Sequence, residues 1–250
     1  MIDFHSHILP ELDDGANNVQ TSLEMLRISK ASGVNTVIAT SHCYPTDQAA
    51  VLKFIEDRRY AYNLLQAEGC SQQDSLPHII KASEVHLCHG VSKLKNLDEL
   101  CIEDTEYILI EMPYDKWQDE NFEEIYQLTR LGLKPILAHL DRYMSQEKLF
   151  SELLSLNVLC QINASAFLDH SMRKKLLRLF MKDAVHVIGS DMHNLTFRPP
   201  NLAPAYEIID RKFGWEYVDF LQHNSERILK NKDVLPTRLP KLGFVKKIML

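Results

Sequence analysis

The chain has 250 residues, of which 45% are hydrophobic and 25% are charged, so it can form a large core and is not a disordered or low-complexity chain. Its 28 Lys and Arg against 34 Asp and Glu give a net charge of −6, which argues against a nucleic-acid binder that needs a basic surface. No apolar run approaches the roughly 18 residues of a membrane span, and no charged-then-apolar leader opens the chain. We therefore expect no transmembrane or secretory segment.

The cysteines exclude several other classes of protein. There are 5 of them, they are widely spread, and no C-x-x-C pair occurs, so a disulfide scaffold or a zinc ribbon is a poor interpretation. None is followed six positions later by Arg, which excludes the C-x5-R phosphatases. This usage is typical of a cytoplasmic protein. The residues concerned are Cys43, Cys70, Cys88, Cys101 and Cys160.

Short apolar runs alternate with segments of helical periodicity along the chain. Strands are predicted at 2–4, 34–39, 79–82, 107–110, 135–138, 158–162 and 185–188. A first helix capped by Asn18 is predicted to end near Gly33, and further helices are predicted at 49–67, 121–131, 146–156, 204–213 and 218–229. This alternation predicts an α/β fold with a parallel sheet. The absence of glycine-rich phosphate loops argues against Rossmann and P-loop folds.

Ionisable residues follow almost every predicted strand. Because the carboxyl ends of parallel strands meet at one rim, these side chains are expected to converge although they are far apart in the sequence. Convergence from many strands favours a barrel over an open sheet, whose site lies at one switch point. The residues are His5 and His7, His42, Glu84, Glu111, His139, and Asp191 with His193.

Together with one of the neighbouring Asp13 and Asp14, these residues give nine candidate metal ligands. Burying so many ionisable groups at one rim is unfavourable unless cations compensate them. Imidazole and carboxylate without thiolate suit Zn, Mn, Fe or Co. Nine ligands exceed the needs of one ion, so two or three ions are expected, with Glu84 or Glu111 bridging them.

Several motifs carry a resemblance to a known superfamily. They are the segments 3–15 (DFHSHILPELDDG), 40–42 (TSH), 83–84 (SE), 110–111 (IE), 139–142 (HLDR), 161–163 (QIN) and 190–193 (SDMH). The sequence resembles the PHP (polymerase and histidinol phosphatase) superfamily. Within that superfamily it is similar to the bacterial manganese-dependent protein-tyrosine phosphatases of capsule and exopolysaccharide gene clusters. The resemblance runs from residue 3 to about residue 230, nearly the whole chain.

The resemblance implies a distorted (β/α)7 barrel, in one domain spanning residues 1–250 with 232–250 as a tail, and a centre of three Mn²⁺ ions, for which Fe, Zn or Co are alternatives. It assigns His5, His7, Glu84 and Asp191 to one ion, Glu84, Glu111 and His139 to a second, and Asp14, His42 and His193 to a third. Arg142 and Arg198 match the arginines that hold the substrate phosphate. Leu140 and Asp141 replace the usual Pro-Glu ahead of Arg142, which puts the reach of that arginine in question.

The implied activity is hydrolysis of phosphotyrosine in a protein, with the C-terminal tyrosine cluster of a capsule-regulating bacterial tyrosine kinase as the implied partner. Metal ions would lower the pKa of a bound water from about 15.7 toward 7 and so provide hydroxide at neutral pH. Three alternatives stay open: a small-molecule phosphatase acting on a compound such as histidinol phosphate, a metal-dependent amidohydrolase, and a non-catalytic regulatory barrel. The sequence leaves a homo-oligomer open.

Overall fold

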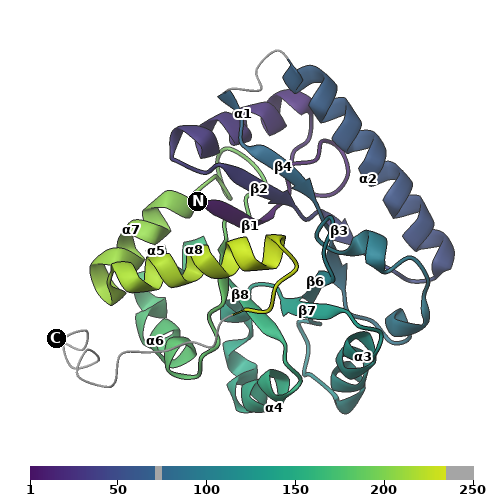
Figure 1. Ribbon diagram of the computed structural model, residues 1–250, viewed down its shortest axis with the longest axis vertical. Coiled ribbons are helices and arrows are strands. Elements are labelled where there is room, and N and C mark those ends of the chain that lie inside the picture. Colours follow the sequence, from purple (N-terminus) through teal and green to yellow (C-terminus); the bar gives the residue numbers. More distant parts are fainter. Residues whose placement is uncertain (71–74, 235–250) are drawn as a thin grey trace.

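The computed structural model describes residues 1–70 and 75–234, in which short strands lie at the centre and helices surround them (Figure 1). The strands are β1 (Ile2–Ser6), β2 (Thr36–Ala39), β3 (His42–Cys43), β4 (His78–Lys81), β5 (Glu84–His86), β6 (Tyr107–Glu111), β7 (Lys134–Leu137), β8 (Leu159–Asn163) and β9 (Val187–Gly189). The α-helices are α1 (Val19–Ala31), α2 (Gln48–Gly69), α3 (Asp119–Arg130), α4 (Phe150–Ser155), α5 (Ala164–Leu168), α6 (Arg173–Met181), α7 (Leu202–Phe213) and α8 (Trp215–Leu229). No helix among the described residues is both long and apolar enough to cross a membrane.

All the strand pairs are parallel. One sheet has the order β1-β2-β4, and a second has the order β3-β5-β6-β7-β8-β9. Two residues separate β2 from β3, and two separate β4 from β5, so the chain passes directly from one sheet into the other. Beyond the last strand, Ser6 pairs with Met192, and the His7 backbone N–H donates to the Met192 carbonyl at 2.9 Å. The result is a curled parallel sheet in a mixed α/β fold, as the sequence predicts.

The predicted elements lie close to those observed. Each of the seven predicted strands is present, and no end is shifted by more than two residues. Asn18 caps α1, because its side-chain oxygen accepts a hydrogen bond from the Thr21 N–H at 2.8 Å. The predicted helix at 146–156 is confirmed only in part: α4 covers Phe150–Ser155, and a 3₁₀ helix, η4 (Leu140–Leu149), precedes it, with non-helical backbone at Tyr143. The buried Tyr143 hydroxyl donates to the Met112 carbonyl at 2.7 Å, which ties η4 to the segment after β6.

The two faces of the strands have different roles. In β6, Tyr107 and Leu109 belong to an inner apolar cluster, whereas Ile108 and Ile110 belong to the large cluster that also includes helix residues. Because successive strand residues alternate between faces, Glu111 continues the inner face. The inner cluster also contains Phe4, Ile38, Ala82, Ile102, Ile136, Ala138, Val187 and Ile228. The inner face therefore combines an apolar base with ionisable residues at the carboxyl ends of the strands.

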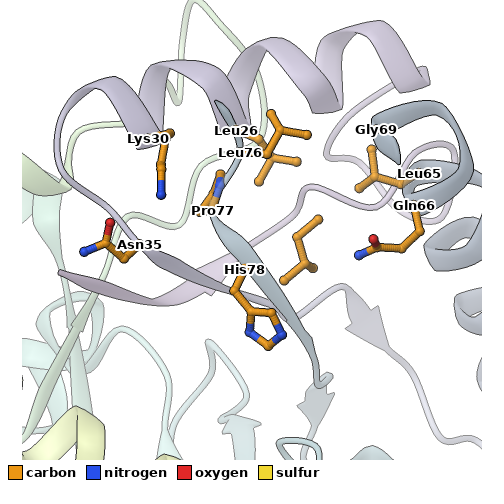
Figure 2. Close-up of a pocket in the computed structure, with 10 residues that line it drawn as sticks. Leu26, Lys30, Asn35, Leu65, Gln66, Gly69, Leu76, Pro77 and His78 are labelled. Atoms are coloured by element: carbon orange, nitrogen blue, oxygen red, sulfur yellow. The ribbon is translucent and has the colours of Figure 1, made fainter. Parts of the chain in front are cut away.

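A cavity of about 460 Å³ lies at the opposite end of the strands (Figure 2). Asn35, which precedes β2, and His78, which begins β4, line it together with Leu26 and Lys30 of α1. Its position at the amino ends of β2 and β4 separates it from the ionisable rim.

Gly189 at the end of β9 provides a test of the packing of the inner face. A Cβ at this position would lie 2.4 Å from the His5 Cβ and 2.7 Å from the His5 backbone nitrogen. We expect Gly189→Ala to lower the free energy of unfolding by about 1–3 kcal/mol, because the backbone has to shift to relieve this overlap. Urea unfolding measures the change.

Gly69→Ala is the matched control, since among the described residues its Cβ would meet only the flexible end of Leu76, at 3.2 Å, and one further leucine methyl. Equal unfolding midpoints for the two variants would contradict the close approach of β9 to His5.

Candidate metal centre

The Glu84 carboxylate is the central group of the site. It is buried at the start of β5, and four imidazoles from three other segments of the chain contact it. Its Oε2 lies 3.1 Å from His5 Nε2, 3.3 Å from His7 Nε2 and 3.1 Å from His42 Nδ1. Its Oε1 lies 2.7 Å from His139 Nε2. These contacts lower the pKa of Glu84 well below its usual value despite its burial, with the charge of His5 the strongest favourable influence.

Two more acids complete the buried part of the site. Glu111 Oε1 lies 3.5 Å from His139 Nε2. Asp191 Oδ1 lies 3.6 Å from His5 Nε2 and 3.5 Å from His7 Nε2. Both carboxylates therefore face the imidazoles that surround Glu84.

The mouth of the site is formed by Asp14, His42 and His193. Asp14 Oδ1 lies 3.4 Å from His193 Nε2 and 3.6 Å from His42 Nε2. The Asp14 side chain is 66% exposed, whereas His193 is buried. The structure thus brings all nine candidate ligands into one continuous cluster.

The spacing of these donor atoms fits metal coordination. An ion at about 2.0–2.2 Å from each of two ligands holds those ligands about 2.9–3.5 Å apart in tetrahedral or octahedral geometry. The two Nε2 atoms of His5 and His7 are 3.0 Å apart, and the contacts with Glu84 fall in the same range. In the part of the chain that the structure describes, three groups have donor atoms within 4.8 Å of one another: His5, His7 and Glu84; His42, Glu84 and Glu111; and His7, Asp14, His42 and His193.

His7 belongs to two of these groups, whereas the resemblance assigns it to one ion only. The position of the His7 ring follows from the hydrogen bond that its Nδ1 makes with Asp13. Asp13 Oδ2 accepts a hydrogen bond from His7 Nδ1 at 2.7 Å and another from the His42 N–H at 2.9 Å. Asp13 Oδ1 accepts from the Gly15 N–H at 3.0 Å. Asp13 therefore orients His7 so that Nε2 points into the site, and Asp14 is the acid beside His42.

Two hydrogen-bonded side chains on β8 connect three of the candidate ligands. Gln161 Oε1 accepts from the His139 N–H at 2.7 Å and lies 3.2 Å from His5 Nδ1. Gln161 Nε2 donates to Asn163 Oδ1 at 3.0 Å, and Asn163 Nδ2 donates to Asp191 Oδ2 at 2.7 Å. Because Gln161 and Asn163 share the inner face of β8, they reach one ligand in β1 and two that lie just after β7 and β9.

Two of the candidate ligands have unusual backbone. His139 has φ 35° and Asp191 has φ 56°, in the left-handed region that non-glycine residues rarely adopt. Each stands two positions after the end of a strand, β7 or β9, so the turn redirects its side chain toward the rim. Backbone strain of this kind is common at functional sites.

Arg142 and Arg198 lie at the same rim. The Arg142 guanidinium forms an ion pair with Asp191 Oδ2, and Arg198 forms one with Asp191 Oδ1. Arg198 Nη1 also lies 2.7 Å from His193 Nε2. The side chains are 29% and 35% exposed, so both arginines can still meet a ligand from solvent. Leu140 is buried and does not prevent Arg142 from reaching the site.

His86 is a residue of the site that the sequence analysis did not single out. Its Nδ1 lies 3.4 Å from Glu111 Oε2, and the two residues are register partners on β5 and β6. A signal was present in the sequence, since His86 follows Glu84 by two positions and so shares its strand face.

Arg58 on α2 is a further residue that the sequence did not reveal. It is 6% exposed, and Nη1 donates to the Ala82 carbonyl at 3.0 Å and to Ser83 Oγ at 2.7 Å. Nη2 donates to the Glu99 carbonyl at 2.7 Å. Arg58 thus holds the break between β4 and β5 immediately before Glu84.

The fold and the site together define an α/β protein with a cluster of His, Asp and Glu groups able to hold metal ions. Residues 1–230 match the family described as capsular polysaccharide synthesis, CpsB/CapC, and the chain belongs to this family.

The chain is 32% identical to the tyrosine-protein phosphatase CpsB of Streptococcus agalactiae serotype III (strain NEM316), over 92% of this chain and 99% of that protein. It is 30% identical to the tyrosine-protein phosphatase YwqE of Bacillus subtilis (strain 168), over 94% of this chain and 93% of that protein. One solved structure has a TM-score of 0.82 and 28% identity to this chain. It comes from work on YwqE of Bacillus subtilis and CpsB of Streptococcus pneumoniae, which are described there as unique metal-dependent tyrosine phosphatases. The structure covers 96% of this chain and 100% of its own.

The role of Arg58 can be tested through stability. We expect Arg58→Met to lower the free energy of unfolding by about 1–3 kcal/mol, because it leaves buried acceptors at Ala82 and Ser83 without a donor. Arg59→Met is the control, since Arg59 is the exposed neighbour on the same helix. Denaturant unfolding compares the two variants, and an equal loss of stability in both would contradict the anchoring role.

Metal uptake is expected to release protons. Burial disfavours charge on His7 and His139, but hydrogen bonds outweigh it: those to Asp13 and Glu84 raise the pKa of His7 to about 10, and those to Glu111 and Glu84 raise that of His139 to about 9. At pH 7 both imidazoles of the ion-free protein are therefore protonated, and each has to lose its proton to bind a metal. Affinity should rise with pH toward about 9–10.

Isothermal titration of Mn²⁺ into chelator-treated protein at pH 7, in two buffers of different ionisation enthalpy, measures the proton release. A binding enthalpy that is the same in both buffers would contradict it.

Proposed function

We propose that the chain is a metal-dependent tyrosine-protein phosphatase, which hydrolyses the phosphate monoester of phosphotyrosine in a protein. The observation that carries this proposal is the position of two arginines at the rim of a nine-residue His, Asp and Glu cluster. The tyrosine-phosphatase names of relatives that align over nearly the whole chain support it over the small-molecule phosphatase, amidohydrolase and regulatory alternatives.

The residues proposed to hold the ions are the nine of the cluster, and Mn²⁺ is the proposed metal. One ion would take His5, His7, Glu84 and Asp191, a second Glu84, Glu111 and His139, and a third Asp14, His42 and His193. When bound, such ions act as Lewis acids and lower the pKa of coordinated water. The donor set, imidazole and carboxylate without thiolate, suits Mn as well as Zn, Fe and Co.

The residues of the chain itself orient and neutralise the substrate. The guanidinium groups of Arg142 and Arg198 present planar pairs of N–H donors, which match two oxygens of a phosphate. Their positive charges offset the negative charge that the phosphate carries into the site. The leaving tyrosinate has a parent pKa near 10, so it requires less help from a general acid than a serine alkoxide.

The proposal extends to the protein substrate, the location and the complete fold. The protein substrate would be a bacterial tyrosine kinase that controls capsule or exopolysaccharide synthesis, dephosphorylated at its C-terminal tyrosine cluster. The described cysteines are all free, which supports a reducing cytoplasm. The pairing of Ser6 with Met192 supports a distorted (β/α)7 barrel in a single domain of residues 1–250. Residues 235–250 of the proposed tail lie outside the described residues.

Arg198→Ala tests the assigned role of this arginine. We expect about a 100-fold loss in the rate of hydrolysis of a phosphotyrosine peptide, because one of the two charged donors to the phosphate is removed. Metal content, measured by elemental analysis, should stay at the wild-type value. Histidinol phosphate serves as the competing substrate.

Arg211→Ala on α7 is the matched control, since this exposed arginine lies outside the site. Metal loss in Arg198→Ala would assign Arg198 to the structure of the centre instead, and a preference for histidinol phosphate would overturn the tyrosine-phosphatase proposal.

A further inference from the structure

Three exposed aromatic side chains follow candidate ligands along the chain. Tyr44 comes two positions after His42, Tyr114 three positions after Glu111, and Phe197 four positions after His193. Their side chains are 56%, 65% and 92% exposed. We call Tyr44, Tyr114 and Phe197 the aromatic collar.

Phe197 lies on a loop with a well-defined backbone. Asn194 Oδ1 accepts hydrogen bonds from the N–H groups of Thr196 at 3.1 Å, Phe197 at 2.8 Å and Arg198 at 3.1 Å. The His193 N–H also donates to the Arg198 carbonyl at 2.9 Å. Phe197 is therefore displayed toward solvent by a structured turn, which is unfavourable for a large apolar ring unless a ligand covers it.

The other two rings contact the site directly. The Tyr114 hydroxyl accepts a hydrogen bond from Arg142 Nη1 at 3.0 Å. The Tyr44 ring centroid lies 5.6 Å from that of His42 and 5.7 Å from that of His86. Tyr114 thus contacts an arginine and Tyr44 a candidate ligand at the rim, whereas Phe197 directly precedes Arg198 in the chain.

We propose that the aromatic collar receives the phenyl ring of the substrate phosphotyrosine and so sets the preference for aryl over alkyl phosphates. This inference rests on the proposed function. In phosphotyrosine the ring is bonded to the ester oxygen, so a phosphate held by Arg142 and Arg198 places the ring beside the side chains that adjoin these arginines. Aromatic rings attract one another edge to face or offset at centroid distances of about 4.5–7 Å.

The test compares two ligands that differ only in the ring. Phenylphosphonate and methylphosphonate are titrated into Mn²⁺-loaded wild-type protein and into the variants Phe197→Ala and Tyr44→Ala. We expect each variant to weaken phenylphosphonate binding by about three- to tenfold. Methylphosphonate binding should stay within about twofold of wild type, because its phosphonate meets the arginines alone.

Trp215→Ala is the control, because Trp215 is 65% exposed but begins α8, outside the rim. Thermal unfolding checks that all the variants fold, which is expected because the replaced rings are exposed. If wild type prefers phenylphosphonate and both collar variants keep that preference, the role proposed for the aromatic collar is wrong, although the proposed function stands. If wild-type protein does not hydrolyse a phosphotyrosine peptide, the proposed function fails and this inference fails with it.

Discussion

The contact of one buried carboxylate with four imidazoles is the constraint on which the rest of the structure depends. Glu84 is fully enclosed, and ionisable groups in such a place are stable only when opposite charges or metal ions compensate them. Arg58 fixes the backbone just ahead of it, and Asp13 and Gln161 fix the imidazoles that face it. The surrounding polar groups therefore act as a frame for this single cluster.

The parallel strands position these groups with little departure from regular backbone geometry. Alternation along β6 and β8 sends apolar side chains outward to the helices and brings Glu111, Gln161 and Asn163 to the inner face. Where alternation would misdirect a side chain, the backbone departs from regular geometry, as the positive φ angles of His139 and Asp191 show. At the rim these turns direct the two side chains into the site, and the apolar base lies below them.

The site divides into layers of different chemistry. Except for the exposed Asp14, the imidazoles and carboxylates form the inner layer, the two arginines lie at its edge, and the aromatic collar is exposed to solvent. A phosphate monoester of tyrosine has the same order of parts, with an anionic group at one end and a ring next to it. This correspondence links the metal centre, the proposed phosphatase activity and the proposed aryl preference.

The sequence by itself determined the parallel α/β class, the identity of eight of the nine clustered residues and the exclusion of cysteine-based chemistry, because strand and helix periodicity and the residues that follow each strand are local properties. It left the ninth open between Asp13 and Asp14, which only the resemblance to a known family resolved. Only the tertiary structure decided that Arg58 reaches the backbone before Glu84, that His86 faces Glu111 and that His7 is shared between two groups of ligands. These facts depend on strand register and on contacts between distant segments. A charged residue on a mostly polar helix such as α2 gives no local sign of whether its side chain turns inward. The 3₁₀ geometry of η4 likewise depends on a distant contact, that of Tyr143 with the segment after β6.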